Sequence, residues 1–482
     1  MSSPNHSRRD ILCRIGSVLG LAGAAGLIAD ESAADESAVA SSWLPPKFPN
    51  FAPRAKRAVF LFMSGAPPQM DLWDYKPGLE QQFDQDLPAS VRGNQTLTGQ
   101  TAGQARFPVA PAHWGFGRHG HSGRWISELL PYTAKIVDEL TVIHSMQTDA
   151  INHEPAVLLM TTGNMVPGKP TLGAWLSYGL GSMNENLPCF VVLNSRLIPG
   201  ADQQPVSPKL WGSGFLSNEH AGVAFRSEGD PVLYLHDPPG MSRKTRRTLL
   251  TGVNEINQLE YERVGDPETQ ARIKQYEMAF RMQASVPELT NLADEPLSTW
   301  SLYGDDAKIP GTFAYNCLLA RRMAERGVRY TQVFQRGWDV HYNAVGNLPK
   351  LCAATDRACY ALVTDLKRRG LLEDTLVIWG GEFGRTVYSQ GGLSRENYGR
   401  DHHPRCFTMW MAGGGTKPGI AYGATDDYSY NVVKDPMHVR DWSATVLYLL
   451  GIDHEKLSFK FQGLDQKLTG VVPARVVKAL LA

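Results

Sequence analysis

The stretch Thr375–Thr386, which reads TLVIWGGEFGRT, constrains the fold of this chain more than any other segment. Its first five residues are β-branched or apolar, a pattern typical of a strand buried on both faces of a parallel sheet. Glu382 and Arg385 follow two glycines, just past the carboxyl end of that strand. Open α/β sheets bind ligands at this edge. The stretch therefore predicts a ligand site there, although a Glu–Arg pair that closes a turn would read the same way.

Other short apolar runs have the same character and predict further strands, at residues 57–63, 140–144, 190–193, 330–334 and 407–412. Helical patterns separate several of them, such as Asp356–Arg369, which ends at Gly370. We expect residues 75–121 to be a long irregular excursion and residues 125–130 to begin a helix. Strands that alternate with helices predict an α/β fold with a mostly parallel sheet flanked by helices.

Residues 242–326 differ from the rest of the chain because helical patterns follow one another there without a strand pattern. Leu249, Val253 and Ile256 fall on one face of the first of these helices. We interpret this segment as a helical insertion, at about residues 242–326, that packs on the sheet. Residues 41–482 are then expected to form one domain that includes the insertion.

The composition argues against two classes of protein. The chain has 482 residues, of which 43% are hydrophobic, and this is ample for a large core. Its formal net charge is +0, and no basic stripe with interleaved aromatic residues is present. No run of 18 apolar residues occurs after residue 40. We therefore expect no nucleic-acid partner and no transmembrane segment in the mature protein.

The first forty residues read as a targeting segment. The sequence SRRDIL at residues 7–12 resembles a twin-arginine export motif, a mildly apolar stretch covers residues 15–29, and residues 38–40 are small enough for cleavage. We interpret residues 1–40 as a twin-arginine signal peptide, with a weakly apolar N-terminal helix as the alternative. The expected partner is the twin-arginine export machinery, and the expected location is periplasmic or extracellular.

The cysteines do not suggest a disulfide framework. Six are present, and Cys13 lies within the predicted signal peptide, which leaves an odd number. Cys352 and Cys359 are separated by about 10 Å along a predicted helix, too far for a disulfide bond. We predict buried free thiols.

Acidic and imidazole side chains gather next to four of the predicted strands. They are Asp149, His153 and Glu154; Asp339 and His341; Glu382 with Arg385; and Asp401, His402 and His403. Mixed carboxylate and imidazole ligands suit Zn²⁺, Mn²⁺ or Fe, whereas carboxylates alone suit Ca²⁺ or Mg²⁺. The adjacent His402 and His403 cannot easily both bind one ion, so one of them is expected to support the other. The sequence predicts a divalent-metal centre, Zn or Mn before Ca or Mg, with a metal-free acidic pocket as the alternative.

The order of these motifs resembles a known bacterial family. TDxxxHEPAxxxxxTG begins at Thr148, WDxH at Trp338, TLVIWGGEFGR at Thr375 and GRDHHP at Gly399. Together they resemble the family called domain of unknown function 1501, which belongs with the alkaline phosphatase and sulfatase clan. The resemblance covers nearly the whole chain after residue 45, and it implies an alkaline phosphatase-like fold.

The resemblance also implies roles for individual residues. His153 takes the position of the clan's nucleophile, and it would act as a nucleophile or as a ligand for a metal-activated water. Glu382, Asp339 and His341 take metal positions, and His402 or His403 takes that of the last metal histidine. Arg385 would bind the substrate anion.

Several departures from the clan pattern bear on the chemistry. Position 153 carries no Ser, Thr or Cys, so neither a phosphoseryl intermediate nor a formylglycine can form there. The clan's first acidic ligand would fall at Ser64 or Gly65, where Asp71 is the nearby substitute, and Phe383 replaces a ligand histidine. Asp149, Glu154 and Asp401 are further candidates for the site.

Three functions are compatible with the resemblance. The first is an exported, metal-dependent, sulfatase-like hydrolase of phosphate or sulfate esters, with a small-molecule or polysaccharide substrate. The second is a non-catalytic relative of the same fold that binds glycans or a cell-surface partner. The third is a different metal chemistry in the same cleft, such as phosphomutase or esterase activity.

Overall fold

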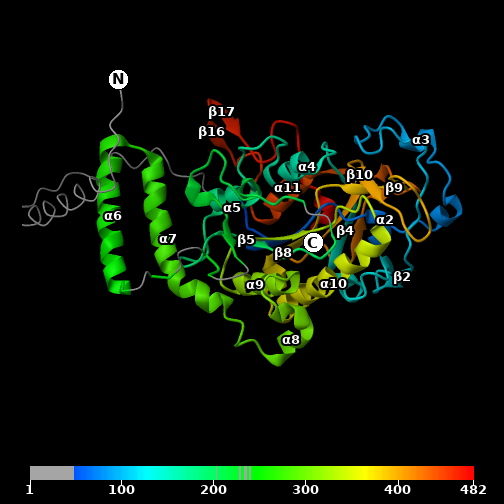
Figure 1. Ribbon diagram of the computed structural model, residues 1–482. Coiled ribbons are helices and arrows are strands. Elements are labelled where there is room, and N and C mark those ends of the chain that lie inside the picture. Colours follow the sequence, from blue (N-terminus) through cyan, green and yellow to red (C-terminus); the bar gives the residue numbers. More distant parts are fainter. Residues whose placement is uncertain (1–47, 202–203, 227–229, 233–235, 238–239) are drawn as a thin grey trace, which may run out of the picture. The chain divides into compact units, whose positions relative to one another are not determined.

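The computed structural model describes residues 48–201, 204–226, 230–232, 236–237 and 240–482 (Figure 1). These belong to one compact unit, Pro46–Ala482. The predicted signal peptide at residues 1–40 lies outside the described residues. Within the described ranges, no helix has the length and apolar character needed to cross a membrane.

One sheet of nine strands forms the centre of this unit. Eight strands follow the order β12, β4, β11, β8, β1, β7, β5, β6, and β15 pairs with β4. Every strand predicted from the sequence is present in it. The bounds are β1 Arg57–Ser64, β4 Leu140–Gln147, β5 Phe190–Asn194, β6 Val223–Phe225, β7 Tyr330–Arg336, β8 Thr375–Gly380, β11 Phe407–Ala412, β12 Ile420–Tyr422 and β15 Met437–His438.

The sheet is mostly parallel, as the sequence predicts, and β11 is the exception. The strands β8, β1, β7, β5 and β6 pair in parallel, whereas β11 runs antiparallel to both β8 and β4. The amino end of β11 therefore lies at the edge where the parallel strands have their carboxyl ends. This direction brings the residues just before β11 to the same edge as those that follow β4, β7 and β8.

Both faces of the sheet are buried. Along β1, Val59 and Leu61 belong to one apolar cluster and Phe60 and Phe62 to another, because successive side chains point to opposite faces. Residues of α7, α9 and α10 complete the first cluster, and residues of α4, α5 and α11 complete the second. The helices are α4 His153–Thr162, α5 Leu172–Leu180, α6 Arg243–Val264, α7 Pro267–Thr290, α8 Leu297–Tyr303, α9 Phe313–Glu325, α10 Ala344–Arg368 and α11 Val439–Leu449.

The helical region packs on the sheet only in part. Helix α9 contacts β7 and α10, which agrees with the prediction of a helical layer against the sheet. Helix α6 packs on α7, and the apolar face of Leu249, Val253 and Ile256 is exposed. This face of α6 therefore does not lie against the sheet, and the helical insertion at about residues 242–326 stays a prediction.

The excursion between β1 and β4 contains more regular structure than the sequence suggests. The predicted helix from residue 125 is wrong: residues there form β3 Arg124–Ser127, paired with β2 Phe116–His119. Gly120 and Gly123 both adopt positive φ in the turn that joins the two strands, and this turn fixes a hairpin.

The remaining short elements are α2 Gln69–Leu72, α3 Ala89–Arg92, β9 Gly384–Ser389, β10 Arg400–His403, β13 Ala424–Thr425, β14 Val432–Lys434, β16 Phe459–Phe461, β17 Leu464–Gln466 and seven 3₁₀ turns at Pro77–Gln82, Thr133–Glu139, Pro208–Leu210, Asn218–His220, Asp305–Lys308, Leu372–Asp374 and Lys478–Leu480.

The thiol prediction is confirmed for the described residues. All five cysteines found there are free, and four of them are buried. Burial raises the pKa of Cys189 to about 11, so this thiol is protonated at neutral pH.

Candidate metal centre

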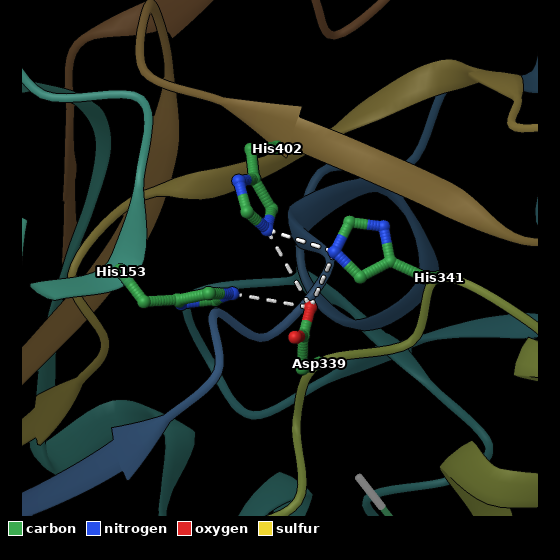
Figure 2. Close-up of side chains that lie close together, drawn as sticks. All are labelled: His153, Asp339, His341 and His402. Carbon is green, nitrogen blue, oxygen red and sulfur yellow. Dashed lines mark hydrogen bonds and ion pairs between the residues drawn. The ribbon is translucent and has the colours of Figure 1, made fainter. Parts of the chain in front are cut away.

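Four side chains from three separate segments of the chain converge at the carboxyl edge of the sheet. They are His153 at the start of α4, Asp339 and His341 after β7, and His402 in β10. One ligand atom from each lies within 4.8 Å of the other three. Figure 2 shows the three imidazole rings pointing toward the carboxylate of Asp339. Three of these residues are buried and His153 is nearly so, which makes a closed cluster of four potential ligands.

The distances between the ligand atoms are short. The Nε2 atoms of His341 and His402 are 2.9 Å apart, and His341 Nε2 is 2.9 Å from Asp339 Oδ1. Asp339 Oδ1 also lies 3.1 Å from His153 Nε2 and 3.6 Å from His402 Nε2. Two ligands bound at about 2.0–2.1 Å to one ion lie about 3 Å apart when they subtend a right angle. The spacing therefore fits a shared cation.

The hydrogen-bond partner of the outer nitrogen, Nδ1, determines the tautomer of each ring. His153 Nδ1 is 2.6 Å from Glu382 Oε1, and His402 Nδ1 is 2.7 Å from the carbonyl oxygen of Ile151. His341 Nδ1 is 2.5 Å from Gln390 Oε1, while Gln390 donates its own amide to Gln100. A carboxylate and a carbonyl can only accept, so each Nδ1 carries the hydrogen.

This arrangement leaves the lone pair of each neutral ring on Nε2, which faces the centre. His153 Nε2 is buried, and at 3.1 Å from Asp339 it makes no hydrogen bond of acceptable geometry with a described residue. Lone pairs that face one another at such distances repel unless a cation lies between them. Donation of the outer N–H to an oxygen is also the usual support of a metal-bound histidine.

Two glycines let the loops of the site come close together. A Cβ added at Gly65, which follows β1, would lie 2.4 Å from the backbone nitrogen of Asp339. A Cβ added at Gly399, which precedes β10, would lie 1.7 Å from the carbonyl oxygen of His341. No other residue fits at these positions without moving the loop that carries Asp339 and His341.

Asp339 is held by groups on both of its oxygens. The guanidinium of Arg385 donates to Oδ1, and the amide of Gln204 donates to Oδ2. Arg385 also donates to the carbonyl oxygens of Gly65, Ala66 and Arg400. The side chain of Arg385 is fully buried, and these hydrogen bonds hold together the loops around Asp339.

The charges of the cluster follow from burial and from these contacts. Burial favours the neutral acid, yet Arg385 and the three histidines hold the pKa of Asp339 far below its ordinary value. Burial lowers the pKa of His402 to about 4, assisted by Arg385 and the other two rings. Burial also acts to lower the pKa of His153, but the contacts with Asp339 and Glu382 outweigh it and raise that pKa. An ionised carboxylate therefore stands among imidazoles, as a cation site requires.

The residues that the sequence singled out next to the strands do not all join this cluster. Glu382 contacts it through His153, and its Oε1 also accepts the backbone N–H of Gly65 at 2.9 Å. Glu382 Oε2 is buried and makes no hydrogen bond with a described residue. Direct metal binding by Glu382 stays a prediction.

His403 and Asp401 do not belong to the group of four ligands, although Asp401 Oδ1 lies 4.0 Å from Nδ1 of His341. Both nitrogens of His403 are engaged, with the carbonyl of Tyr430 at 2.6 Å and the amide of Gln95 at 2.9 Å. Asp401 accepts the hydroxyls of Thr98 and Thr101. Of these three successive residues of β10, only His402 turns a ring nitrogen to the cluster.

The remaining candidates form ion pairs elsewhere. Asp71 makes a fully buried pair with Arg400, with the closest atoms 2.6 Å apart. Asp149 pairs with His438 and with Arg440, and Glu154 is exposed beside Lys209.

The groups that hydrogen-bond to the four potential ligands were not predicted from the sequence. Gln390, Gln204 and the carbonyl of Ile151 are distant in sequence from the rings and the carboxylate that they contact. Only Gly65 and Gly399 carried a signal, since each lies beside a strand or motif that the sequence itself distinguishes.

Three solved structures show a distant similarity to this chain. A sulfatase from Pseudoalteromonas sp. is 12% identical, covers 83% of this chain and 69% of its own, and gives a TM-score of 0.33. A protein of the alkaline phosphatase superfamily from Vibrio parahaemolyticus is 10% identical, with coverage of 84% and 68% and a TM-score of 0.33. A phosphonate monoester hydrolase from Silicibacter pomeroyi is 11% identical, with coverage of 67% and 68% and a TM-score of 0.27.

No protein of curated function matches the sequence. The family of proteins of unknown function called DUF1501 matches residues 55–481, which is nearly the whole described unit. The family resemblance predicted from the motifs is confirmed, and this chain belongs to the DUF1501 family.

Proposed function

We propose that this protein is an exported, metal-dependent hydrolase of phosphate or sulfate esters, sulfatase-like in its fold. The observation that carries the proposal is the convergence of three imidazole Nε2 atoms on the carboxylate of Asp339, each ring held in the matching tautomer. Three nitrogens and one oxygen suit Zn²⁺ or Mn²⁺ better than Ca²⁺ or Mg²⁺. A divalent cation held there would polarise an ester oxygen and lower the pKa of a coordinated water.

The residues around the cluster have distinct parts in this proposal. His153, Asp339, His341 and His402 bind the cation, and Glu382 orients the ring of His153. His153 is also the first residue of α4, whose opening N–H groups favour a bound anion. Binding of the substrate anion by Arg385 stays a prediction, which requires its guanidinium to exchange one of its present contacts for the substrate.

The class of ester and the route of export belong to the same proposal. Sulfated or phosphorylated polysaccharide and small aryl esters are the substrates to examine first. Export would follow the twin-arginine route and would place the protein in the periplasm or outside the cell. The motif at residues 7–12 supports this location.

A substrate panel tests the hydrolase. Aryl phosphates, aryl sulfates and sulfated glycans are offered to the full chain with Zn²⁺, Mn²⁺, Ca²⁺ or Mg²⁺ added singly. We expect turnover of at least one class, its loss in His153→Ala and His341→Ala, and full turnover in the matched control His121→Ala, because His121 is exposed and outside the cluster. Full turnover in His341→Ala would refute the assignment of the site.

The second candidate is a non-catalytic relative that binds glycans or a cell-surface partner. The absence of a hydroxyl or thiol at residue 153 favours it, since the covalent routes of the clan need such a group. If the wild type and His153→Ala are inert on every ester and bind a sulfated glycan equally well, this second function replaces the hydrolase.

A further inference from the structure

Helix α6 carries a row of apolar side chains that no described residue covers. Leu249, Val253, Ile256 and Leu259 are 51%, 40%, 47% and 66% exposed. Their spacing keeps them on one side of the helix. Helix α6 buries none of its side chains, and it lies alongside α7 (Figure 1). The row, which we call the α6 stripe, is therefore an apolar surface without a partner among the described residues.

The charges of α6 are divided between its two halves. Residues 243–253 contain four basic side chains and no acidic one, whereas residues 254–264 contain three acidic side chains and one basic. The members are Arg243, Lys244, Arg246 and Arg247, then Glu255, Glu260, Glu262 and Arg263. This order opposes the dipole of the helix itself, which favours acidic residues near the N-terminus and basic residues near the C-terminus.

Helix α7 accounts for only part of this pattern. Arg247 pairs with Glu277 of α7 at 2.7 Å, Arg243 lies over the ring of Phe280, and Arg246 pairs with Asp237 at 2.9 Å. Lys244 and Glu255 form no ion pair with a described residue. Glu260 is paired within α6 itself, with Arg263. The division of charge therefore suits a second neighbour that runs antiparallel to α6 along the α6 stripe.

We propose that α6 of a second copy of this chain covers the α6 stripe, in an antiparallel pair with twofold symmetry. In such a pair the basic half of each helix faces the acidic half of the other. A parallel pair would place basic against basic and acidic against acidic. A twofold contact uses the same patch on both copies, so the patch must be complementary to itself when the two helices run in opposite directions.

Three of the four stripe residues fit this symmetry, and the fourth, Val253, would face Glu255. With the axis at the level of Asn254, residues equally far from Asn254 face each other. Leu249 then faces Leu259 of the second copy, and Ile256 of the second copy faces Gly252, where an added Cβ would meet no described atom within 4 Å. The missing side chain of Gly252 leaves space for Ile256, and charged residues flank the apolar row as in paired helices.

Sedimentation equilibrium of the full chain tests the proposal. We expect a species with twice the mass of one chain at micromolar concentrations. Ile256→Glu should weaken the dimer at least about tenfold, because it places a charge in the apolar contact. Leu297→Glu is the matched control, since Leu297 is 83% exposed on α8 and outside the stripe, and it should leave the dimer unchanged.

A charge exchange identifies the antiparallel partner. One variant carries Lys244→Glu with Arg246→Glu, and another carries Glu260→Lys with Glu262→Lys. The second variant alone should be monomeric, since both of its halves are basic. The first variant alone should associate more weakly than the wild type, since its N-terminal half loses its net positive charge. An equimolar mixture should form a heterodimer, because the acidic half of the first variant then faces the basic half of the second. Failure of the mixture to associate would overturn the antiparallel pairing.

Two further outcomes would overturn the proposal as a whole. A wild-type chain that stays monomeric at high concentration would mean that the stripe meets some other surface, such as the N-terminal segment or a membrane. A dimer that Ile256→Glu does not weaken would place the contact elsewhere on the molecule.

Discussion

The ionised side chain of Asp339 is the residue on which the cluster depends. It is buried among three imidazoles, and among the described residues only the guanidinium of Arg385 supplies a permanent positive charge in contact with it. A carboxylate in such surroundings is costly unless cations or hydrogen bonds compensate for the lost water. The carboxylate can therefore bind a second positive charge, a metal cation that the Nε2 lone pairs of the three histidines would also coordinate.

Glu382 gives a prediction at this scale. Glu382→Gln removes the negative charge that accepts the N–H of His153, so the affinity for Zn²⁺ should fall about 10–100-fold. Isothermal titration calorimetry measures the affinity, and circular dichroism checks that the fold is retained.

Glu154→Gln is the matched control, because Glu154 is exposed and next to His153 in sequence. It should bind Zn²⁺ as the wild type does. Equal affinity in Glu382→Gln and the wild type would contradict the part given to Glu382.

The sequence predicted the kinds of residue in the site but not all of their contacts. His153, Asp339, His341 and His402 could be named because each stands next to a predicted strand. The choice between His402 and His403 could not be made, since it depends on which face of β10 turns inward. Contacts such as that of Gln390 with His341 exist only once the chain has folded.

At the scale of elements, the strands around the site owe their position to pairings that local sequence does not express. The six longest strands of the nine-stranded sheet could be predicted because their apolar runs are continuous. The antiparallel direction of β11 could not, since an apolar run reads the same in both directions. Hairpin β2–β3 was missed because the residues of β3 do not alternate strictly and one of its side chains is exposed.

The buried pair of Asp71 and Arg400 joins α2 to β10, the strand that carries His402. Asp71 accepts both from the guanidinium, at 2.6 and 2.9 Å, and from the hydroxyl of Tyr398. Asp71→Ala should lower the free energy of unfolding by about 3–5 kcal/mol, because it leaves a buried guanidinium without its partner. Urea denaturation measures the change.

Asp84→Asn provides the comparison for this variant. Asp84 pairs with Arg106 at 3.2 Å, and both side chains are about half exposed. Asp84 has a φ of 60°, which Asn also tolerates, so the substitution removes the charge without straining the backbone. The loss of this pair should cost about 0–1 kcal/mol. A loss no larger in Asp71→Ala than in Asp84→Asn would show that the buried pair does not stabilise β10.

At the scale of the whole molecule, the chain combines a family domain with a segment expected to direct its export. The DUF1501 match begins at residue 55, after the predicted signal peptide. Export through the twin-arginine route follows folding, so a cation could be bound before the protein leaves the cytoplasm.

The paired arginines give the prediction at this scale. Replacing both Arg8 and Arg9 by Lys should retain the precursor in the cytoplasm, because the export machinery recognises the two guanidinium groups. Cell fractionation and immunoblotting follow the protein. Unchanged export of this double variant would refute the twin-arginine route.

The metal content of the purified chain tests the central claim most directly. After incubation with Zn²⁺ or Mn²⁺ and removal of the excess, elemental analysis should find about one or two ions per wild-type chain. Asp339→Ala should bind far less while keeping its fold, and the exposed control His121→Ala should bind as much as the wild type. A wild-type chain without bound metal, or an Asp339→Ala chain with the same content, would contradict the account.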